Sequence, residues 1–349
     1  MAIAGTPAVS TRHFDVRWIT RAPVDVLVAF AWVPIWLVAH AVRADTDAVA
    51  ALAGWVLLIS FAHQPVTLPL IYGDVRERRR RTRLLVAAPV VAVVAAFVGL
   101  TISVLVTALA AAAWNGHHTL RQRYGILRVY GRKVGQTDGD HEQGILFWWF
   151  GAAVAVVFAD PGAPDKLQAL PLGRVNTQII DLLAMLRPIA VVVALVTIVG
   201  ASITTWRWAS LERTRDRLNP AKYLYLFGAF GLFAMAPVDP VATVLGFALA
   251  HSIEYFVVVH GTVRRRATAG SLLERVVRPR FGPALFLTIY TGMVLALVAG
   301  LKTGLSRNLF GAIYLGFGAL HFAYDGLIWK LRSPAVAQQF DVVPGLSSD

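Results

Sequence analysis

Residues 84–118 read LLVAAPVVAVVAAFVGLTISVLVTALAAAAWNGHH, a stretch of 35 residues without an acidic or basic side chain other than its final histidines. One helix crosses the hydrocarbon core of a bilayer with about 20 apolar residues, so the stretch is too long for one span. Arginines are dense on both sides of it, at 76–83 and from Arg121 onward. Because basic loops stay on the cytoplasmic side, both flanks belong on the same side. The sequence therefore predicts two helices that turn near Thr101–Ser103.

The rest of the chain has the composition of a helical membrane protein. Of its 349 residues, 57% are hydrophobic and 15% are charged, and its mean hydropathy is +0.61. These values are unusual for a soluble globular domain, and apolar runs of spanning length recur along the chain. The predicted fold class is therefore all-α, a polytopic transmembrane helical bundle.

Basic clusters set the predicted topology. If all of them face the cytoplasm, an even number of spans separates each neighbouring pair, which gives about ten helices with both termini cytoplasmic. The clusters lie at residues 12–21, 76–83, 121–133, 207–222, 264–280 and 330–332. The ten predicted helices are 23–42, 48–72, 84–101, 104–127, 144–159, 186–206, 222–237, 241–261, 283–301 and 308–329.

One membrane domain is expected. Residues 1–22 are predicted to be a cytoplasmic N-terminal segment, 23–332 a single transmembrane helical domain and 333–349 a cytoplasmic C-terminal tail. The N-terminus lacks the basic and apolar regions of a signal peptide, so the first helix is expected to be a retained span. The segment 160–185, which contains three prolines, is expected to be a loop along the outer surface.

Charge and cysteine content exclude several classes of function. The net charge of +13 fits cytoplasmic loops that meet anionic lipid, so membrane lipid is the expected partner and nucleic acid is not. The chain has no cysteine, which excludes thiolate metal sites, iron–sulfur clusters and disulfides. We expect an integral membrane protein of a bacterial-type inner or plasma membrane.

Five histidines lie at a similar depth on helices that run in the same predicted direction. His63, His117, His118, His251 and His321 each precede a basic residue near the cytoplasmic helix end by 9 to 13 residues. At about 1.5 Å of rise per residue, they fall at nearly one level of the bilayer. Ionisable groups at that depth are costly and need a partner, and a shared metal is the best single partner. Adjacent residues on a helix point about 100° apart, so only one of His117 and His118 is required at the common centre.

Two of these histidines have a carboxylate one turn away. Glu254 follows His251 at i+3 and Asp325 follows His321 at i+4, so each pair faces the same way. These carboxylates are the predicted catalytic groups, either as metal ligands or as the groups that fix the histidine tautomers. Further candidates for the cofactor site adjoin the histidines, and Arg121 is a candidate partner of Glu254 or Asp325 if it is buried: Trp114, Arg121, Gln122 and Tyr324.

Each candidate also has an ordinary structural interpretation. A single intramembrane histidine often forms an interhelical hydrogen bond, and Arg121 near a helix end can extend to the headgroups. His260 lies closer to the interface and is expected to contact headgroups, whereas His13, His40 and His141 are expected to have no role in the site. Glycines in the predicted helices leave room either for a long substrate chain or, as we expect, for close helix packing: Gly228, Gly231, Gly246, Gly316 and Gly318.

The histidine pattern resembles that of integral-membrane, histidine-rich non-haem iron oxygenases. One group, the fatty acid desaturases and hydroxylases, carries HxxxH and HxxHH clusters, whereas this chain has the single pair His117-His118 and no HxxHH. A second group, the bacterial membrane β-carotene dioxygenases, is similar in length and helix number and holds one iron with histidines from separate helices. The resemblance implies non-haem iron, O₂ and a lipophilic substrate such as a carotenoid or fatty acyl lipid, with an electron-donor protein as a further partner.

Other functions remain open at the level of sequence. Imidazole also suits zinc, copper and nickel, and the sequence leaves one metal or two. A haem-b electron-transfer protein would use two facing histidines as axial ligands. A proton-coupled transporter would use the His251/Glu254 and His321/Asp325 pairs as a relay.

Overall fold

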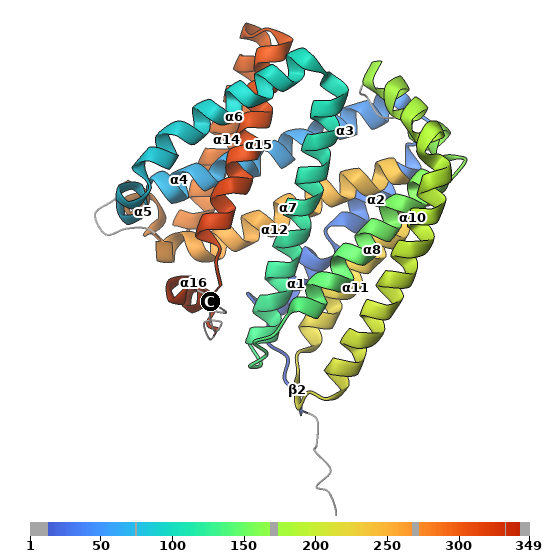
Figure 1. The fold of residues 1–349 in the computed structure, drawn as a ribbon. Helices are drawn as coiled ribbons and strands as arrows, with labels where there is room; N and C mark the ends of the chain where they lie inside the picture. The colour runs from blue at the N-terminus through green and yellow to red at the C-terminus, as the bar shows by residue number, and fades with distance from the viewer. Residues whose placement is uncertain (1–12, 74, 168–173, 267–271, 332, 343–349) are drawn as a thin grey trace, which may run out of the picture.

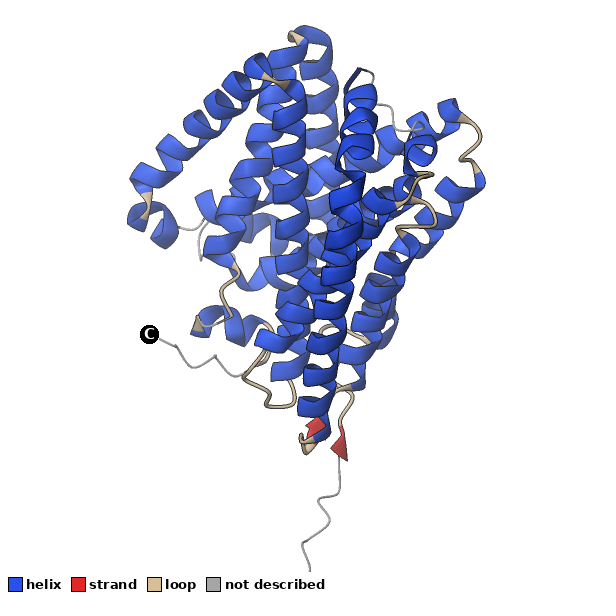
Figure 2. Ribbon diagram, turned by 45° about the vertical axis from the view of Figure 1, so that its right-hand side comes forward, coloured by secondary structure: helices blue, strands red, loops and turns tan. Residues whose placement is uncertain are grey.

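The computed structural model describes residues 13–73, 75–167, 174–266, 272–331 and 333–342 of the chain. Helices make up nearly all of the described residues (Figures 1 and 2). The two described strands, β1 (His13–Phe14) and β2 (Arg217–Leu218), pair in parallel. This confirms the all-α fold class. The predicted N-terminal segment and C-terminal tail lie partly outside the described residues.

The helices follow the apolar runs of the sequence. Described helices overlap all ten predicted ranges, and several extend beyond them. Their bounds are α1 (Ala22–Phe30), α2 (Trp32–Ala41), α3 (Thr46–His63), the 3₁₀ turn η1 (Gln64–Val66), α4 (Thr67–Tyr72), α5 (Val75–Arg80), α6 (Thr82–Ile102), α7 (Val104–Arg132), α8 (Asp140–Ala159), α9 (Ala163–Leu167), α10 (Arg174–Arg213), α11 (Pro220–Met235), α12 (Pro240–Arg266), α13 (Leu272–Val277), α14 (Gly282–Gly304), α15 (Arg307–Ile328) and α16 (Pro334–Gln339).

Within the described part of the chain, seven helical segments are long and apolar enough to cross a membrane. This supports the membrane class, while the number of spans and the side of the termini stay predictions. The seven segments are Ala22–Ala41, Thr46–Tyr72, Thr82–Ile102, Asp140–Ala159, Val175–Arg213, Pro240–Val263 and Gly282–Gly304.

The long apolar stretch does turn where it was expected to. Helix α6 ends at Ile102, and Ser103 adopts an extended backbone before α7 begins. The Ser103 hydroxyl accepts a hydrogen bond from the backbone N–H of Val106, at 3.3 Å. A serine N-cap of this kind satisfies one of the free N–H groups at a helix start, which explains how the turn forms without glycine or proline.

The segment 160–185 is less open than the sequence suggested. Proline content indicated a loop, but α9 and the first turns of α10 occupy much of it. Residues 168–173 lie outside the described part of the chain. The prediction of one long surface loop is therefore wrong for 163–167 and 174–185.

Helix α12 lies at the centre of the bundle. It packs against α1, α2, α3, α11 and α14, while α7 packs against α6, α8, α11 and α15 (Figure 1). Two of the closest approaches depend on glycine. A Cβ at Gly228 would collide with the backbone carbonyl of Ala29, and one at Gly316 would lie 2.8 Å from the Val93 side chain. The glycines therefore serve close packing, as is usual in membrane bundles, rather than making room for a ligand.

The outer helices present apolar side chains to their surroundings. Examples are Val90 on α6, Val192 on α10 and Leu297 on α14, which are more than half exposed. Such a surface suits lipid. The buried polar and charged residues lie inside the bundle, and the largest group of them belongs to the candidate site.

Several members of the basic clusters, which were expected to face the cytoplasm, are instead buried. Arg123 and Arg128 lie within α7 and are 1% and 5% exposed, and Lys222 in the first turn of α11 is 1% exposed. Each of them makes specific polar contacts. The Arg128 guanidinium donates to the carbonyl of Thr137, for example. The prediction from the basic clusters therefore placed more positive charge on the protein surface than the structure does.

Candidate metal centre

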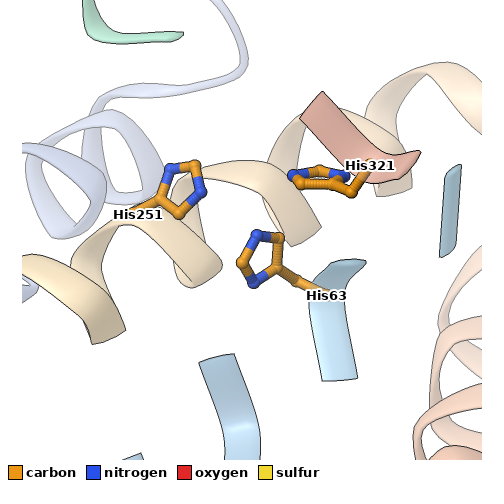
Figure 3. Close-up of side chains that lie close together, drawn as sticks. All are labelled: His63, His251 and His321. Carbon is orange, nitrogen blue, oxygen red and sulfur yellow. The ribbon is translucent and has the colours of Figure 1, made fainter. Parts of the chain in front are cut away.

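Four histidines from four helices meet inside the bundle. His63 ends α3, His118 lies on α7, His251 on α12 and His321 on α15. Their ring centroids are separated by 4.6 Å (His63–His251), 4.8 Å (His63–His321), 4.8 Å (His118–His321) and 5.2 Å (His118–His251). Figure 3 shows three of these rings turned toward a common point. We refer to these four residues as the histidine cluster.

A break in the helix places His63. The chain leaves α3 at this residue and passes through η1, which contains Pro65, before α4 begins. Proline lacks a backbone N–H and cannot continue regular helical hydrogen bonding, so a tighter 3₁₀ turn replaces one turn of α-helix. The result sets His63 at the kink and Thr67 on the turn that follows, and both face α12 and α15.

Burial is nearly complete throughout the histidine cluster. His63, His251 and His321 are each 1% exposed, and His118 is 8% exposed. Buried imidazole normally requires hydrogen bonds to both nitrogens, because an unpaired buried polar atom costs about 1–3 kcal/mol. The helices therefore hold four polar rings at a depth where they need partners.

Several of these nitrogens lack such partners. Among the described residues, no hydrogen bond reaches Nε2 of His63, His118 or His321, or either nitrogen of His251. The other nitrogen is fixed in two of the rings: His63 Nδ1 lies 3.0 Å from Ser252 Oγ, and His321 Nδ1 lies 2.8 Å from Thr67 Oγ1. Five nitrogens of the four rings thus have no hydrogen-bond partner among the described residues, and each ring can offer one of them to a common centre.

The spacing matches what imidazole ligands require. A ligating nitrogen lies about 2 Å from its metal, and the ring centroid lies about 1 Å farther out. Two ligand rings on one ion are then about 4–5 Å apart when adjacent and about 6 Å apart when opposite. The adjacent rings here are 4.6–5.2 Å apart, and His251 and His321 are 6.4 Å apart. In addition, ligand atoms of His63, His251 and His321 all lie within 4.8 Å of one another, as do those of His118, His321 and Asp325.

Asp325 is the carboxylate that reaches the histidine cluster. Its Oδ2 lies 3.6 Å from Nε2 of His321 and 3.8 Å from Nε2 of His118. Its Oδ1 accepts hydrogen bonds from Thr67 Oγ1 at 3.2 Å, the Tyr255 hydroxyl at 2.9 Å and Trp329 Nε1 at 3.2 Å. The carboxylate is therefore oriented by one oxygen and directed toward the histidines with the other.

Glu254 plays a different part from the one that its spacing suggested. The carboxylate is fully buried and lies 3.0 Å from the guanidinium of Arg123, and its Oε2 accepts a hydrogen bond from Gln122 Nε2 at 3.1 Å. The same Gln122 nitrogen donates to the backbone carbonyl of His251, also at 3.1 Å. Glu254 therefore connects α12 to α7 beside His251.

Arg121 does not meet the condition of burial under which it would pair with Glu254 or Asp325. Arg121 is exposed, donates to Gln143 Oε1 at 2.9 Å and lies over the Tyr124 ring. Arg123, two residues later, is the arginine that pairs with Glu254. The two positions point in different directions from α7, and only Arg123 faces α12.

The remaining candidates lie outside the histidine cluster. His117 is exposed and its ring contacts Phe147, and Trp114 is 60% exposed. His118 is thus the member of the pair that faces the common centre. Tyr324 is buried on α15, but its hydroxyl lies 3.1 Å from that of Tyr72, away from the four rings.

The histidines expected to have no role also lie apart from the site. His40 lies 2.9 Å from Asp239 and stacks on Trp36, and His260 is exposed. His13 belongs to the short strand β1. His141 lies in the first turn of α8.

Sequence reasoning missed four residues around the site. Tyr255 follows His251 by one helical turn, and Ser252 is next to it, so their proximity was open to recognition. Thr67 depends on the kink at η1, and Arg123 depends on how α7 is rotated against α12. Neither of those two carries a local sequence pattern.

No protein-family model, curated protein or solved structure matches this chain.

Proposed function

We propose that this chain is an integral-membrane metalloenzyme, whose histidine cluster binds a transition metal, iron before others, and brings O₂ to a lipophilic substrate. The observation that carries the proposal is that four buried imidazole rings from four helices lie together, each with a nitrogen that has no hydrogen-bond partner among the described residues. The proposal includes location in an inner or plasma membrane of bacterial type, which agrees with the apolar helices.

A metal accounts for this arrangement better than a proton network does. Neutral imidazoles that face one another bring lone pairs together, and a proton placed between two of them leaves the others unpaired. One cation with bonds of about 2 Å satisfies several nitrogens at once. The helices then provide a preformed site, in which hydrogen bonds from the ring Nδ1 atoms of His63 and His321 to the hydroxyls of Ser252 and Thr67 fix ring orientation, as is common around metal ligands.

Iron and O₂ are supported by the donor set together with the sequence pattern. Imidazole suits iron, zinc, copper and nickel, and a neighbouring carboxylate favours non-haem iron among them. The resemblance to membrane iron oxygenases points the same way. A bound metal would supply Lewis acidity and open coordination positions, and the apolar helices around the site suit a carotenoid or a fatty acyl lipid as substrate. Where the reaction requires external electrons, a donor protein would supply them.

The geometry favours this function over two others. A haem would need open space between its two axial histidines, but the rings of His63 and His118 lie close to both His251 and His321. A proton relay through His251 and Glu254 is weakened because Glu254 pairs with Arg123. Both alternatives predict a full-length protein without bound non-haem metal.

Metal analysis of the purified full-length protein tests the proposal. We expect about one equivalent of iron after expression in iron-supplemented medium, and strong loss of metal in His63→Ala, His118→Ala, His251→Ala and His321→Ala. His117→Ala is the matched control, because this exposed histidine is next to His118 on the same helix, and it should retain metal. Less than about a tenth of an equivalent of any transition metal in the wild-type protein would overturn the proposal.

Oxygen consumption tests the enzymatic part. Iron-loaded protein in nanodiscs should consume O₂ when β-carotene is present, or when an unsaturated acyl lipid is present together with a chemical reductant that supplies the two electrons of hydroxylation or desaturation, and His251→Ala should not. Product analysis by mass spectrometry then distinguishes cleavage, hydroxylation and desaturation. An iron-loaded protein that consumes no O₂ with either class would reduce the proposal to metal binding alone.

A further inference from the structure

Asp325 lies at the edge of the histidine cluster in a geometry that a hydrogen bond does not explain. Its Oδ2 is 3.6 Å from His321 Nε2 and 3.8 Å from His118 Nε2. Both separations exceed the 2.7–3.2 Å of an N–H···O hydrogen bond. They are nevertheless close enough for all three atoms to contact one small ion.

The protonation pattern around His321 sharpens this point. Thr67 Oγ1 lies 2.8 Å from His321 Nδ1, 2.8 Å from the Tyr255 hydroxyl and 3.2 Å from Asp325 Oδ1. When this hydroxyl donates its proton to Tyr255 or Asp325, it accepts one from His321 Nδ1, and Nε2 then keeps a lone pair. This lone pair and the Asp325 Oδ2 atom are both acceptors, so a cation that contacts both of them would be stabilised.

Three donors hold the carboxylate in this position. Thr67, Tyr255 and Trp329 all donate to Oδ1, from α4, α12 and the residue that follows α15. These hydrogen bonds fix the rotation of the carboxylate and keep Oδ2 directed toward the histidines. An orientation secured from three elements is what a metal ligand requires from its surroundings.

We propose that Asp325 is a direct ligand of the metal bound by the histidine cluster, through Oδ2. The inference rests on the proposed metal site and goes further, because it makes the site a mixed histidine and carboxylate centre. Two ligand atoms that are each about 2 Å from an ion lie about 3–4 Å apart, which matches both separations from Asp325. Glu254 does not share this role, because it is engaged by Arg123 and Gln122.

A carboxylate ligand would lower the net charge of a metal buried in this site. Four neutral imidazoles leave a divalent ion with its full charge inside the bundle, where an uncompensated charge is costly. The Arg123–Glu254 pair is neutral overall and offsets none of it. One carboxylate in direct contact halves the net charge, and its hard oxygen favours iron over copper.

A labelling experiment on the wild-type protein tests this directly. The full-length protein is produced with [4-¹³C]aspartate, loaded with Fe(II) and exposed to nitric oxide, which makes the iron visible to electron paramagnetic resonance. We expect a ¹³C hyperfine coupling from one carboxylate, measured by electron–nuclear double resonance. Asp325→Glu is the matched variant, because it keeps a carboxylate without the label and should bind iron without the ¹³C coupling.

Affinity provides the second measurement. Titration with Co(II) of the chelator-treated protein should show a loss of about 100-fold or more in Asp325→Asn, beyond the roughly 10- to 100-fold typical of groups that only orient ligands. Asp325→Glu should retain more affinity than Asp325→Asn. Absence of the ¹³C coupling in wild-type protein that carries iron overturns the ligand role and leaves the proposed metal site standing. Wild-type protein that binds neither Fe(II) nor Co(II) overturns the metal site and the ligand role together.

Discussion

Two clusters of buried polar side chains lie in this bundle, and their polar atoms are partnered in opposite ways. The lysine cluster consists of Lys222 on α11, Glu142 on α8, Glu212 on α10 and Gln136 after α7, all less than 10% exposed. Lys222 Nζ donates to Gln136 Oε1 at 2.8 Å, Glu142 Oε1 at 3.2 Å and Glu212 Oε1 at 2.8 Å. All three protons of the ammonium thus have an acceptor within the protein.

The lysine cluster comes from three helices and the segment after α7, and the equally buried histidine cluster comes from four helices, but the donors and acceptors of the histidine cluster do not match. Five imidazole nitrogens lack a partner among the described residues. The comparison shows that buried polar side chains have different roles in the two clusters. In the lysine cluster every proton of the central ammonium has an acceptor, although Glu142 Oε2 has no hydrogen-bond partner among the described residues, and the cluster ties helices together. In the histidine cluster every ring has a nitrogen without such a partner, which is why we propose a bound metal there.

Among these predictions, loss of the Lys222 ammonium should produce the largest change in the free energy of unfolding. Lys222→Met leaves Glu142 buried without its counterion and leaves Glu212 with Arg215 alone, which we expect to destabilise the protein by about 3–5 kcal/mol. His251→Phe, its counterpart in the metal-free protein, replaces unpaired nitrogens with an apolar ring and should be neutral or stabilising. Thermal unfolding of both variants in the same detergent, with chelator present, measures the difference.

A triple variant controls for this interpretation. Lys222→Met combined with Glu142→Gln and Glu212→Gln removes the stranded Glu142 charge and the Glu212 charge that only Arg215 would still offset, and should recover much of the lost stability. If His251→Phe destabilised the metal-free protein as much as Lys222→Met does, the two clusters would have the same structural role and the comparison would fail.

Metal should stabilise one cluster and leave the other unaffected. Metal at about 100 times its dissociation constant stabilises a folded protein by about 2.7 kcal/mol. We therefore expect the unfolding temperature of wild-type protein to rise on loading, and that of Lys222→Met to rise by a similar amount from its lower starting point. His251→Phe should show little change. A rise in His251→Phe equal to that of the wild type would locate the metal elsewhere.

The sequence identified most of the histidine cluster because depth in a membrane helix can be counted. His63, His251 and His321 stand at similar distances from basic residues at the helix ends, and the positive-inside rule made those distances comparable. The 100° step of a helix also required a choice between His117 and His118, which only packing could make. The turn at Ser103 followed from the same charge argument.

What the sequence left undetermined depends on helix rotation and irregular backbone. Arg123 rather than Arg121 pairs with Glu254 because of the way α7 packs on α12, and charge alone does not distinguish them. Thr67 reaches His321 through the kink at η1. Lys222 belongs to a basic cluster of the sequence, and two of its three acceptors come from residues 80 and 86 positions earlier, so its burial was not evident from the local sequence.

A smaller effect should follow from loss of the hydroxyl that orients His321. Thr67→Val removes the hydrogen bonds to His321 Nδ1 and Asp325 Oδ1 while it keeps the side-chain shape. We expect metal affinity to fall by about 10- to 100-fold, as for other partners that orient ligands. Thr119→Val is the matched control, since Thr119 is buried next to His118 and its hydroxyl has no hydrogen-bond partner in the described structure. Competition with a chelator of known affinity measures both variants, and equal losses would show that Thr67 has no specific part in the site.

The smallest change in the free energy of unfolding should follow from loss of Asp138, at the solvent-exposed edge of the lysine cluster. Arg215 pairs with Glu212 and also with Asp138, whose side chain is 52% exposed. Partial burial raises the pKa of Asp138, but the hydrogen bond and charge of Arg215 outweigh it and hold that pKa below its ordinary value. A carboxyl with a lowered folded-state pKa stabilises the fold above its unfolded-state pKa of about 3.9, and this contribution is lost as pH falls through the folded-state value.

Asp138→Asn should therefore cost less than about 1 kcal/mol at pH 7, because solvent screens an exposed pair. The difference in unfolding temperature from wild type should shrink in high salt and vanish as pH is lowered below 4, while metal content stays unchanged. Lys222→Met should keep most of its effect in high salt, since its partners are buried. If the difference in unfolding temperature between Asp138→Asn and the wild type grew as pH fell, the ionised Asp138 carboxylate would destabilise the folded protein. Arg215, and not Asp138, would then be the outermost residue that contributes to the lysine cluster.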